Sequence, residues 1–191
     1  MSVFEAIRAR RSVGLMKPDL PPKEKVERIL QAGTFAPNHH EVEPWRFFVL
    51  AGKAREELGR TMAASMRIRM EETTSDKAQA ALAKEYNKPL RAPVIIVVAS
   101  LQPNSPKIRD IENLEAVSAA VQNMLLVAEE EGLAAIWRTG NPVYDPNVKA
   151  LYGIQEHEHL VAMIYLGYPA VPKPDKTRIS YEHKTEWRGW E

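Results

Sequence analysis

No cysteine occurs in this chain of 191 residues. That absence excludes disulfide bonds, thiolate metal sites and cysteine nucleophiles together. A long apolar run is also missing, because the longest strongly apolar stretch, Val94–Ala99, is far shorter than the roughly 20 residues that cross a bilayer. The N-terminus carries an acidic residue at Glu5 and has no apolar core, which argues against a secretory signal. We therefore expect a soluble, cytoplasmic protein.

The sequence also lacks an excess of charge of either sign. It has 26 basic and 25 acidic side chains, and they are interspersed along the chain. This balance gives no basis for a nucleic-acid or membrane partner. The length is sufficient to bury one sizeable core, and neither an internal repeat nor a change in composition marks a boundary. We expect a single domain over residues 1–191.

Several well-known functional motifs are absent. The sequence contains no Gly-x-Gly-x-x-Gly, no phosphate-binding Gly-x-x-x-x-Gly-Lys-Ser/Thr and no Gly-x-Ser-x-Gly. A dinucleotide site of the Rossmann type is therefore not expected. The histidines of the two pairs, His39–His40 and His157/His159, are distant in sequence and lack the His-Glu-x-x-His spacing. We predict no metal site from them.

Apolar spacing and punctuation residues predict the secondary structure. Ser2 and Glu5 form a capping box that starts a first helix, and Gly33 is expected at the C-cap of a second. Predicted helices cover 2–10, 21–33, 54–70, 71–86, 113–132 and 146–152, and predicted strands cover 47–50, 94–98, 134–137 and 160–166. Helices interleaved with strands indicate an α+β fold.

Three segments carry further expectations. The segment 71–86 is polar and alanine-rich, so it is predicted to be a helix that walls a pocket only loosely. The helix 113–132 is apolar around much of its circumference, which favours coverage by a partner. The chain after Gly167 is rich in proline and charge and has no core of its own, so we expect it to pack on another surface.

The strongest functional signal comes from the segment Ala36–Leu50 together with Arg10-Arg11-Ser12. Two prolines bracket a polar loop, and a Trp-Arg-Phe-Phe-Val-Leu run then enters a strand, which is a typical setting for a planar ligand. Adjacent arginines beside a hydroxyl suit a phosphate. The alternative is a basic helix end favoured by the helix dipole. Together the two segments indicate a phosphorylated planar cofactor such as flavin mononucleotide (FMN).

These residues also carry a family resemblance. The motifs are Arg10-Arg11-Ser12, Ala36–His39, Glu43–Phe47, Gln122–Leu126, Trp137–Gly140 and Tyr165–Pro169. In this order, over nearly the whole chain, the sequence resembles the FMN-dependent NAD(P)H nitroreductase family. The resemblance implies a mixed, mainly antiparallel sheet flanked by helices. It also implies an intertwined homodimer with FMN sites at the interface, in which residues 169–191 form an extended tail that packs on the partner.

The resemblance assigns roles to individual residues. It implies that Arg10, Arg11 and Ser12 bind the FMN phosphate and ribityl chain. It places His39 and Phe35 against the FMN of the partner, where Phe35 can stack on the flavin but cannot make a polar contact.

Later positions complete the expected site. Trp137, Arg138 and Thr139 are implied to lie at the flavin, where backbone N–H groups donate to flavin N5 and Arg138 offsets charge on the reduced ring. Arg178, with Lys176 as the weaker match, is implied to reach the phosphate. The family often has a basic residue two positions after the serine, but this chain has Gly14 there. Another donor is therefore needed for the negative charge of reduced flavin.

The expected activity is electron transfer from NAD(P)H through FMN to a nitroaromatic, a quinone or another electron-poor acceptor. Without a dinucleotide domain, both substrates would use one cleft in turn, which is a ping-pong mechanism. Because the flavin carries out the redox chemistry, no side chain is predicted to be catalytic. The alternatives are a non-catalytic flavin-binding protein of the same fold and a related flavin dehydrogenase or dehalogenase. The physiological acceptor, the pathway and the choice between NADH and NADPH are not encoded in a readable pattern.

Overall fold

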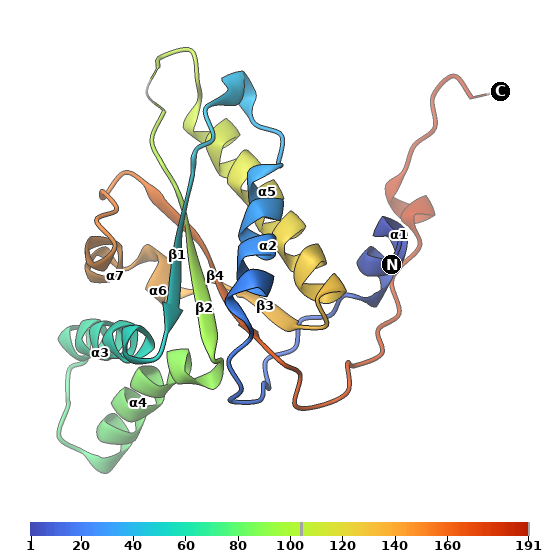
Figure 1. Ribbon diagram of the computed structural model, residues 1–191. Helices are drawn as coiled ribbons and strands as arrows, with labels where there is room; N and C mark the ends of the chain where they lie inside the picture. The colour runs from blue at the N-terminus through green and yellow to red at the C-terminus, as the bar shows by residue number, and fades with distance from the viewer. Residues whose placement is uncertain (104, 191) are drawn as a thin grey trace.

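Four strands form one antiparallel sheet in the computed structural model, which describes residues 1–103 and 105–190 (Figure 1). The strand order is β1-β2-β4-β3. The strands are β1 (Trp45–Ala51), β2 (Val94–Ser100), β3 (Ala134–Arg138) and β4 (His159–Gly167). Every residue of β2 is buried, as its continuous run of β-branched side chains predicts for a central strand. The antiparallel pairing confirms the predicted fold class.

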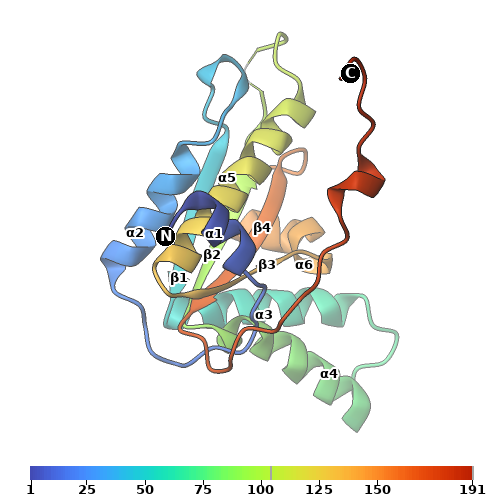
Figure 2. The same ribbon diagram turned by 90° about the vertical axis from the view of Figure 1, so that its right-hand side faces the viewer.

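Helices cover both faces of the sheet (Figures 1 and 2). They are α1 (Val3–Ala9), α2 (Lys23–Thr34), α3 (Lys53–Ile68), α4 (Asp76–Asn87), α5 (Asp110–Glu130), α6 (Asn141–Tyr144) and α7 (Pro146–Leu151). Short 3-10 turns lie at His39–Glu41, Lys88–Arg91 and Tyr181–Lys184. Helices α2 and α5 pack on one face around Val117, Val121 and Met124. Helices α3, α6 and α7 lie on the other, and α4 packs on α3.

The predicted capping box at α1 is confirmed, since Ser2 accepts from the Glu5 backbone and Glu5 accepts from the Ser2 backbone. The prediction that Gly33 caps α2 is wrong. Gly33 lies inside the last turn of α2, and the C-cap is Phe35. A Cβ at Gly33 would be 3.1 Å from Met124 and 3.2 Å from Phe47. The glycine therefore permits the close approach of α2 to α5 and β1.

The predicted helix 71–86 begins later than expected. Its first residues form a turn in which the Glu72 carboxylate accepts from Thr74 and Ser75, and α4 starts at Asp76 with Ser75 as its N-cap. Helix α6 was not predicted, because Gly140 and Pro142 read as turn residues. At its other end α4 is firmly docked, since a Cβ at Gly59 of α3 would be 2.3 Å from the Tyr86 carbonyl oxygen.

A buried carboxylate links α3 to α7. Asp145 is 3% exposed and accepts from the Ser65 hydroxyl at 2.8 Å and from the Asn147 backbone at 2.9 Å. It also forms an ion pair with Arg69. Burial opposes ionisation of Asp145, but the contacts with Arg69 and Ser65 outweigh burial and lower its pKa. This network fixes the segment that follows β3.

The start of the C-terminal segment is attached to its own chain. Ala170 donates to the Leu15 carbonyl at 3.1 Å, and Lys173 forms an ion pair with the buried Glu129 of α5. Beyond that point the chain runs away from the sheet and its helices (Figure 2). Every described residue there is exposed, including Trp187 and Trp190, whose rings meet edge to face at 5.3 Å. As predicted, this tail has no core of its own.

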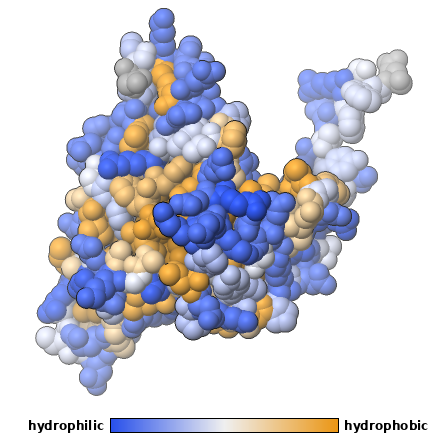
Figure 3. Space-filling view, in the orientation of Figure 1, coloured by the Kyte–Doolittle hydropathy of each residue, from blue (hydrophilic) through white to orange (hydrophobic). Residues whose placement is uncertain are grey.

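The surface over α1, α2 and α5 is partly apolar. Figure 3 shows hydrophobic residues around the N-terminus and beside the hydrophilic cluster that covers the front of α2. The exposed apolar side chains there include Val3, Phe4, Ile7 and Phe35. No helix within residues 1–103 and 105–190 is both long enough and apolar enough to cross a membrane.

Candidate functional site

Two predicted motifs lie side by side at the edge of the sheet. β3 is an edge strand, and the segment after α1 runs along its free side. Ser12 forms a parallel bridge with Ala135, and the Val13 backbone donates to the Ala135 carbonyl at 3.3 Å. This pairing brings the segment Arg10–Ser12 next to the strand that ends at Trp137 and Arg138.

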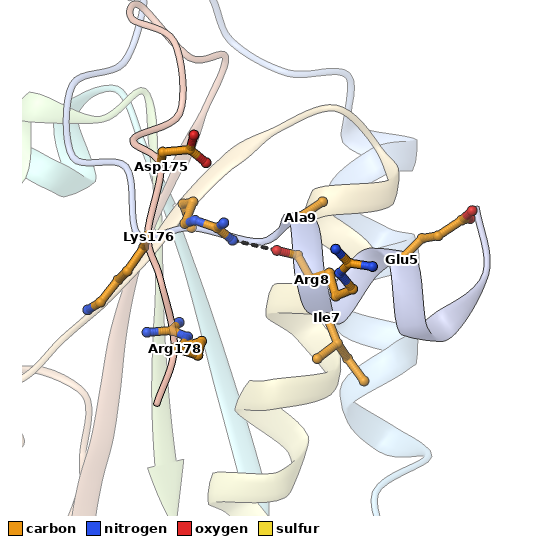
Figure 4. Close-up of a pocket in the computed structure, with 8 residues that line it drawn as sticks. Glu5, Ile7, Arg8, Ala9, Asp175, Lys176 and Arg178 are labelled. Carbon is orange, nitrogen blue, oxygen red and sulfur yellow. Dashed lines mark hydrogen bonds between the residues drawn. The ribbon is translucent and has the colours of Figure 1, made fainter. Parts of the chain in front are cut away.

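A basic cavity lies between α1 and the tail (Figure 4). Its volume is about 730 Å³. The charged side chains that line it are Arg8, Arg11, Lys176 and Arg178, against the carboxylates of Glu5 and Asp175. Four cations and two carboxylates leave a net charge of +2, which favours an anionic ligand.

Arg11 is held in place by backbone acceptors. Its Nη1 donates to the Arg8 carbonyl at 2.5 Å and to the Arg10 carbonyl at 3.0 Å, and its Nε donates to the Pro174 carbonyl at 3.1 Å. The last contact joins the tail to the segment after α1. The Nη2 group of Arg11 has no hydrogen-bond partner in the described part of the chain and remains available to a ligand.

Arg10 and Ser12 do not line the cavity that Arg11 lines. The backbone leaves helical geometry at Arg10, where ψ is 129°, and successive side chains of an extended segment point to opposite sides. The expected convergence of all three side chains on one anion is thus not seen. Arg11 instead faces the same cavity as Lys176 and Arg178.

At the end of β3, neighbouring side chains point to opposite faces of the sheet. Trp137 packs toward α2 and α5, and its indole Nε1 donates to the Val161 carbonyl at 3.0 Å. Arg138 faces the other side, with its guanidinium carbon 5.2 Å from the centroid of the Tyr165 ring. Burial raises the pKa of Tyr165 to about 12, although Arg138 acts in the opposite direction, so the phenol is neutral at physiological pH.

Arg138 has few polar partners. Its Nε is buried without a hydrogen-bond partner, and no ion pair in residues 1–103 and 105–190 includes it. The strand then ends in a turn, with Thr139 exposed and Gly140 at φ +91°. A positive φ at this glycine is what a strand-to-loop turn requires.

His39 lies in a strained loop. Three non-glycine residues there, His40, Glu41 and Glu43, have positive φ angles of 46–55°, and such strain often accompanies functional loops. The His39 ring is stacked on His40 at 4.1 Å, and its Nδ1 lies 2.9 Å from an oxygen of Glu112. The contact with His39 lowers the pKa of Glu112, and the Arg109 backbone N–H adds to this effect.

Phe35 and His39 face regions away from the basic cavity. Phe35 is 77% exposed and lines an apolar groove of about 330 Å³ between α1, α2 and α5. His39 lines a separate cavity of about 550 Å³ against α5. Within one chain these two residues therefore do not meet Arg11, Arg138 or Arg178.

The sequence did not reveal the partners of several site residues. Acidic residues such as Glu112 in the first turn of α5 are a typical sign of a helix start. The contact between Glu112 and His39, however, depends on the unusual backbone of the loop that carries His39. The approach of Arg138 to Gly14 depends on tertiary pairing at the sheet edge. No cluster of three or more potential metal ligands occurs in the part of the chain that the structure describes.

Comparisons with known proteins agree on one family. The family model described as "Nitroreductase family" matches residues 7–168. YdjA of Escherichia coli (strain K12), named as a candidate NAD(P)H nitroreductase, is 32% identical over 169 residues, which are 88% of this chain and 89% of YdjA.

Two further similar proteins have names that state a bound ligand or a reaction. A structure of a candidate nitroreductase in complex with FMN, from Desulfovibrio desulfuricans, superposes with a TM-score of 0.70 at 27% identity and covers 98% of both chains. Iodotyrosine deiodinase of Thermotoga neapolitana is 28% identical over 92% of this chain and 93% of its own length.

Proposed function

Because this chain belongs to the nitroreductase family, we propose that it is an FMN-dependent oxidoreductase that passes electrons from NAD(P)H to nitroaromatic, quinone or similar electron-poor acceptors. The observation that carries the proposal is the placement of the segment that follows α1 along β3, where Ser12 pairs with Ala135 and Gly14 approaches Arg138. FMN, when bound, supplies the redox chemistry, and the protein supplies binding, orientation and charge. Its cysteine-free composition suits the cytoplasmic location that we also propose.

The residues present fit FMN. A phosphate dianion needs converging cations, and the basic cavity offers Arg11, Lys176 and Arg178. A flavin ring that becomes negative on reduction needs a nearby cation, and Arg138 has a buried Nε without a partner. The turn at Gly140 presents backbone near the end of β3, where N–H groups suit a ring nitrogen.

We propose that Arg11 is the main phosphate ligand of the cavity. Its backbone contacts hold the guanidinium in one geometry, so little side-chain entropy is lost when an anion binds. Arg178 and Lys176 are exposed and contribute weaker, salt-screened attraction. Arg10 and Ser12 do not line this cavity, and we propose that they serve the ribityl side of the ligand.

We propose a homodimer in which Phe35 and His39 contact the FMN of the partner. Both residues lie away from the basic cavity of their own chain, and Phe35 is largely exposed. The apolar groove beside Phe35 and the uncovered aromatic side chains of the tail are surfaces that a second copy can bury. The tail beyond residue 174 is proposed to pack on that copy.

NAD(P)H and the acceptor are proposed to bind the same open face in turn. No separate dinucleotide fingerprint exists in the sequence. Helix α4 is the proposed wall, because it packs on α3 and buries only Ala78.

Steady-state kinetics test this mechanism. Double-reciprocal plots at several acceptor concentrations should give parallel lines, and high acceptor should inhibit competitively against NAD(P)H. Intersecting lines would mean that both substrates occupy the enzyme together, which contradicts the single-face proposal.

A second candidate activity is reductive dehalogenation, which the similarity to iodotyrosine deiodinase favours. An acceptor screen separates the two activities. Nitroaromatics and quinones should be consumed faster than 3-iodotyrosine, measured as NAD(P)H oxidation and as iodide release. Faster iodide release would favour the second candidate.

A further inference from the structure

A second basic cavity lies where the segment after α1 meets the start of β2. Its volume is about 540 Å³. The charged side chains that line it are Lys17, Arg55 and Arg91, and no carboxylate among the residues that the structure describes faces them there. The cavity shares no residue with the one that Arg11 lines. Three cations without an opposing acid make it a site for an anion.

Ordered backbone holds the two sides of this cavity. On one side, Lys17 donates its backbone N–H to the Tyr168 carbonyl at 2.9 Å, and Ala170 donates to the Leu15 carbonyl at 3.1 Å. On the other side, the 3-10 turn Lys88–Arg91 packs on α3 (Figure 1). Because both sides are fixed before a ligand arrives, little backbone ordering would oppose its binding.

Arg55 is the most constrained of the three cations. Its Nη1 donates to the Ala92 carbonyl at 2.5 Å, which orients the guanidinium, while its Nε is buried without a hydrogen-bond partner. Its Nη2 also has no partner in the described part of the chain. No ion pair there includes Lys17, Arg55 or Arg91. A half-buried cation with unmet donors is unfavourable unless a ligand supplies the acceptor.

Gly14 connects this cavity to the proposed flavin site. It lines the cavity, and a Cβ built on it would lie 3.2 Å from Nη2 of Arg138. Arg138 ends β3, where the FMN ring is proposed to bind. The second cavity thus adjoins the ring end of that site and is separate from the Arg11 cavity, which is proposed for the FMN phosphate. A second phosphorylated ligand that approaches the flavin would find a cationic site here.

We infer that this cavity binds the 2′-phosphate of NADPH, so that the protein uses NADPH in preference to NADH. The inference rests on the proposed function, because it takes NAD(P)H as the electron donor. The two nucleotides differ only in this phosphate monoester, which carries about −1.5 to −2 charge near neutral pH and has three free oxygens. Such a group matches three cations on three separate segments. The pyrophosphate is a poorer match, because each phosphorus carries a single charge and has the rest of the ligand on both sides.

The experiment compares kcat/KM for NADPH and NADH, measured on the FMN-loaded protein with one quinone acceptor. The unmodified protein should prefer NADPH at least about tenfold, which is the discrimination that charge-assisted hydrogen bonds to one phosphate provide. Arg55→Gln should remove most of this preference, and Arg55→Lys should keep most of it because the charge remains. A purely structural role of Arg55, through its bond to Ala92, would lower both kcat/KM values together and leave their ratio unchanged.

Exposed residues provide an arm that does not depend on Arg55. Lys17 and Arg91 are exposed, so the double variant Lys17→Gln/Arg91→Gln should fold normally. It should lower the NADPH preference roughly threefold, and this loss should shrink at high salt. Lys53→Gln is the matched control, because Lys53 is an exposed cation of the same helix as Arg55 and lies outside the cavity. Its preference should equal that of the unmodified protein.

Binding without turnover gives a second measurement. Calorimetric titration with adenosine 2′,5′-bisphosphate and with adenosine 5′-monophosphate isolates the 2′-phosphate, since the two ligands are otherwise the same. The bisphosphate should bind the unmodified protein about tenfold more tightly. The difference should close in Arg55→Gln and persist in Lys53→Gln.

Equal use of NADPH and NADH by the unmodified protein, with equal binding of the two adenosine ligands, would overturn the inference. An equal loss with both nucleotides in the double variant would also overturn it, because the cavity would then hold the shared pyrophosphate. If Arg55→Gln does not fold, an unchanged preference in the double variant at low salt is the refuting result. FMN-loaded protein that oxidises neither nucleotide would refute the proposed function instead, and the calorimetric titrations would still decide whether the cavity takes a 2′-phosphate.

Discussion

Replacing Arg11 by glutamine should weaken FMN binding through loss of the phosphate contact. Arg11 is half-buried, three backbone carbonyls orient its guanidinium, and its Nη2 group has no partner in the described part of the chain. A hydrogen bond to a charged group contributes about 1.5–3 kcal/mol. We therefore expect the Kd for FMN to rise roughly 10–150-fold.

Arg178→Gln is the matched control because Arg178 lines the same cavity but is exposed. An exposed ion pair contributes only about 0.2–1 kcal/mol, so its Kd should rise no more than roughly fivefold. Its effect should shrink further in high salt, while most of the Arg11 effect should remain.

The assay is a titration of apoprotein with FMN, followed by quenching of flavin fluorescence. A parallel titration with riboflavin, which has the same ring and no phosphate, isolates the phosphate contact. The Arg11→Gln penalty should disappear with riboflavin. An equal penalty for both ligands would show that Arg11 acts by holding the tail, and an unchanged FMN Kd would refute the phosphate assignment.

Further predictions concern stability and assembly. Asp145→Ala should lower the free energy of unfolding by roughly 2–4 kcal/mol, as measured by urea denaturation, because the helix cap is lost and the buried Ser65 O–H loses its acceptor. Arg69→Gln should lower the free energy of unfolding by less than Asp145→Ala does, because Asp145 keeps its hydrogen bonds from Ser65 and Asn147. Because the folded pKa of Asp145 is lowered, its contribution is present above the unfolded pKa and is lost as pH falls through the folded value, so the Asp145→Ala difference should shrink in acid. Sedimentation at micromolar concentration should show a dimer, whose obligate interface would bury more than ~2,000 Å². A folded monomer there would remove the proposed role of His39 across the interface.

The elements that local patterns specify were predictable from the sequence. The continuous apolar run of β2 indicates a strand buried on both faces, and the Ser2/Glu5 box indicates the start of α1. Gly33 was misassigned because a glycine near a helix end has the same local pattern whether it caps the helix or admits a neighbour. Only the contact with Met124 and Phe47 separates the two cases.

The arrangement of the candidate site residues could not be predicted from the sequence. Arginines beside a hydroxyl indicated an anion, but the alternation of an extended backbone sends Arg11 away from Arg10 and Ser12. The meeting of Gly14 and Arg138 follows from the pairing of Ser12 with Ala135. Such long-range pairings leave no trace in local spacing. The roles that we give these residues remain predictions.

Anaerobic titration of the purified, FMN-loaded protein with NAD(P)H tests the central claim most directly. The account predicts that about one equivalent of NADH or NADPH per flavin bleaches the yellow absorbance, and that adding a quinone or nitroaromatic restores it. A protein that binds FMN and stays yellow with both nucleotides would be a flavin-binding protein without turnover, and the proposed oxidoreductase function would be wrong.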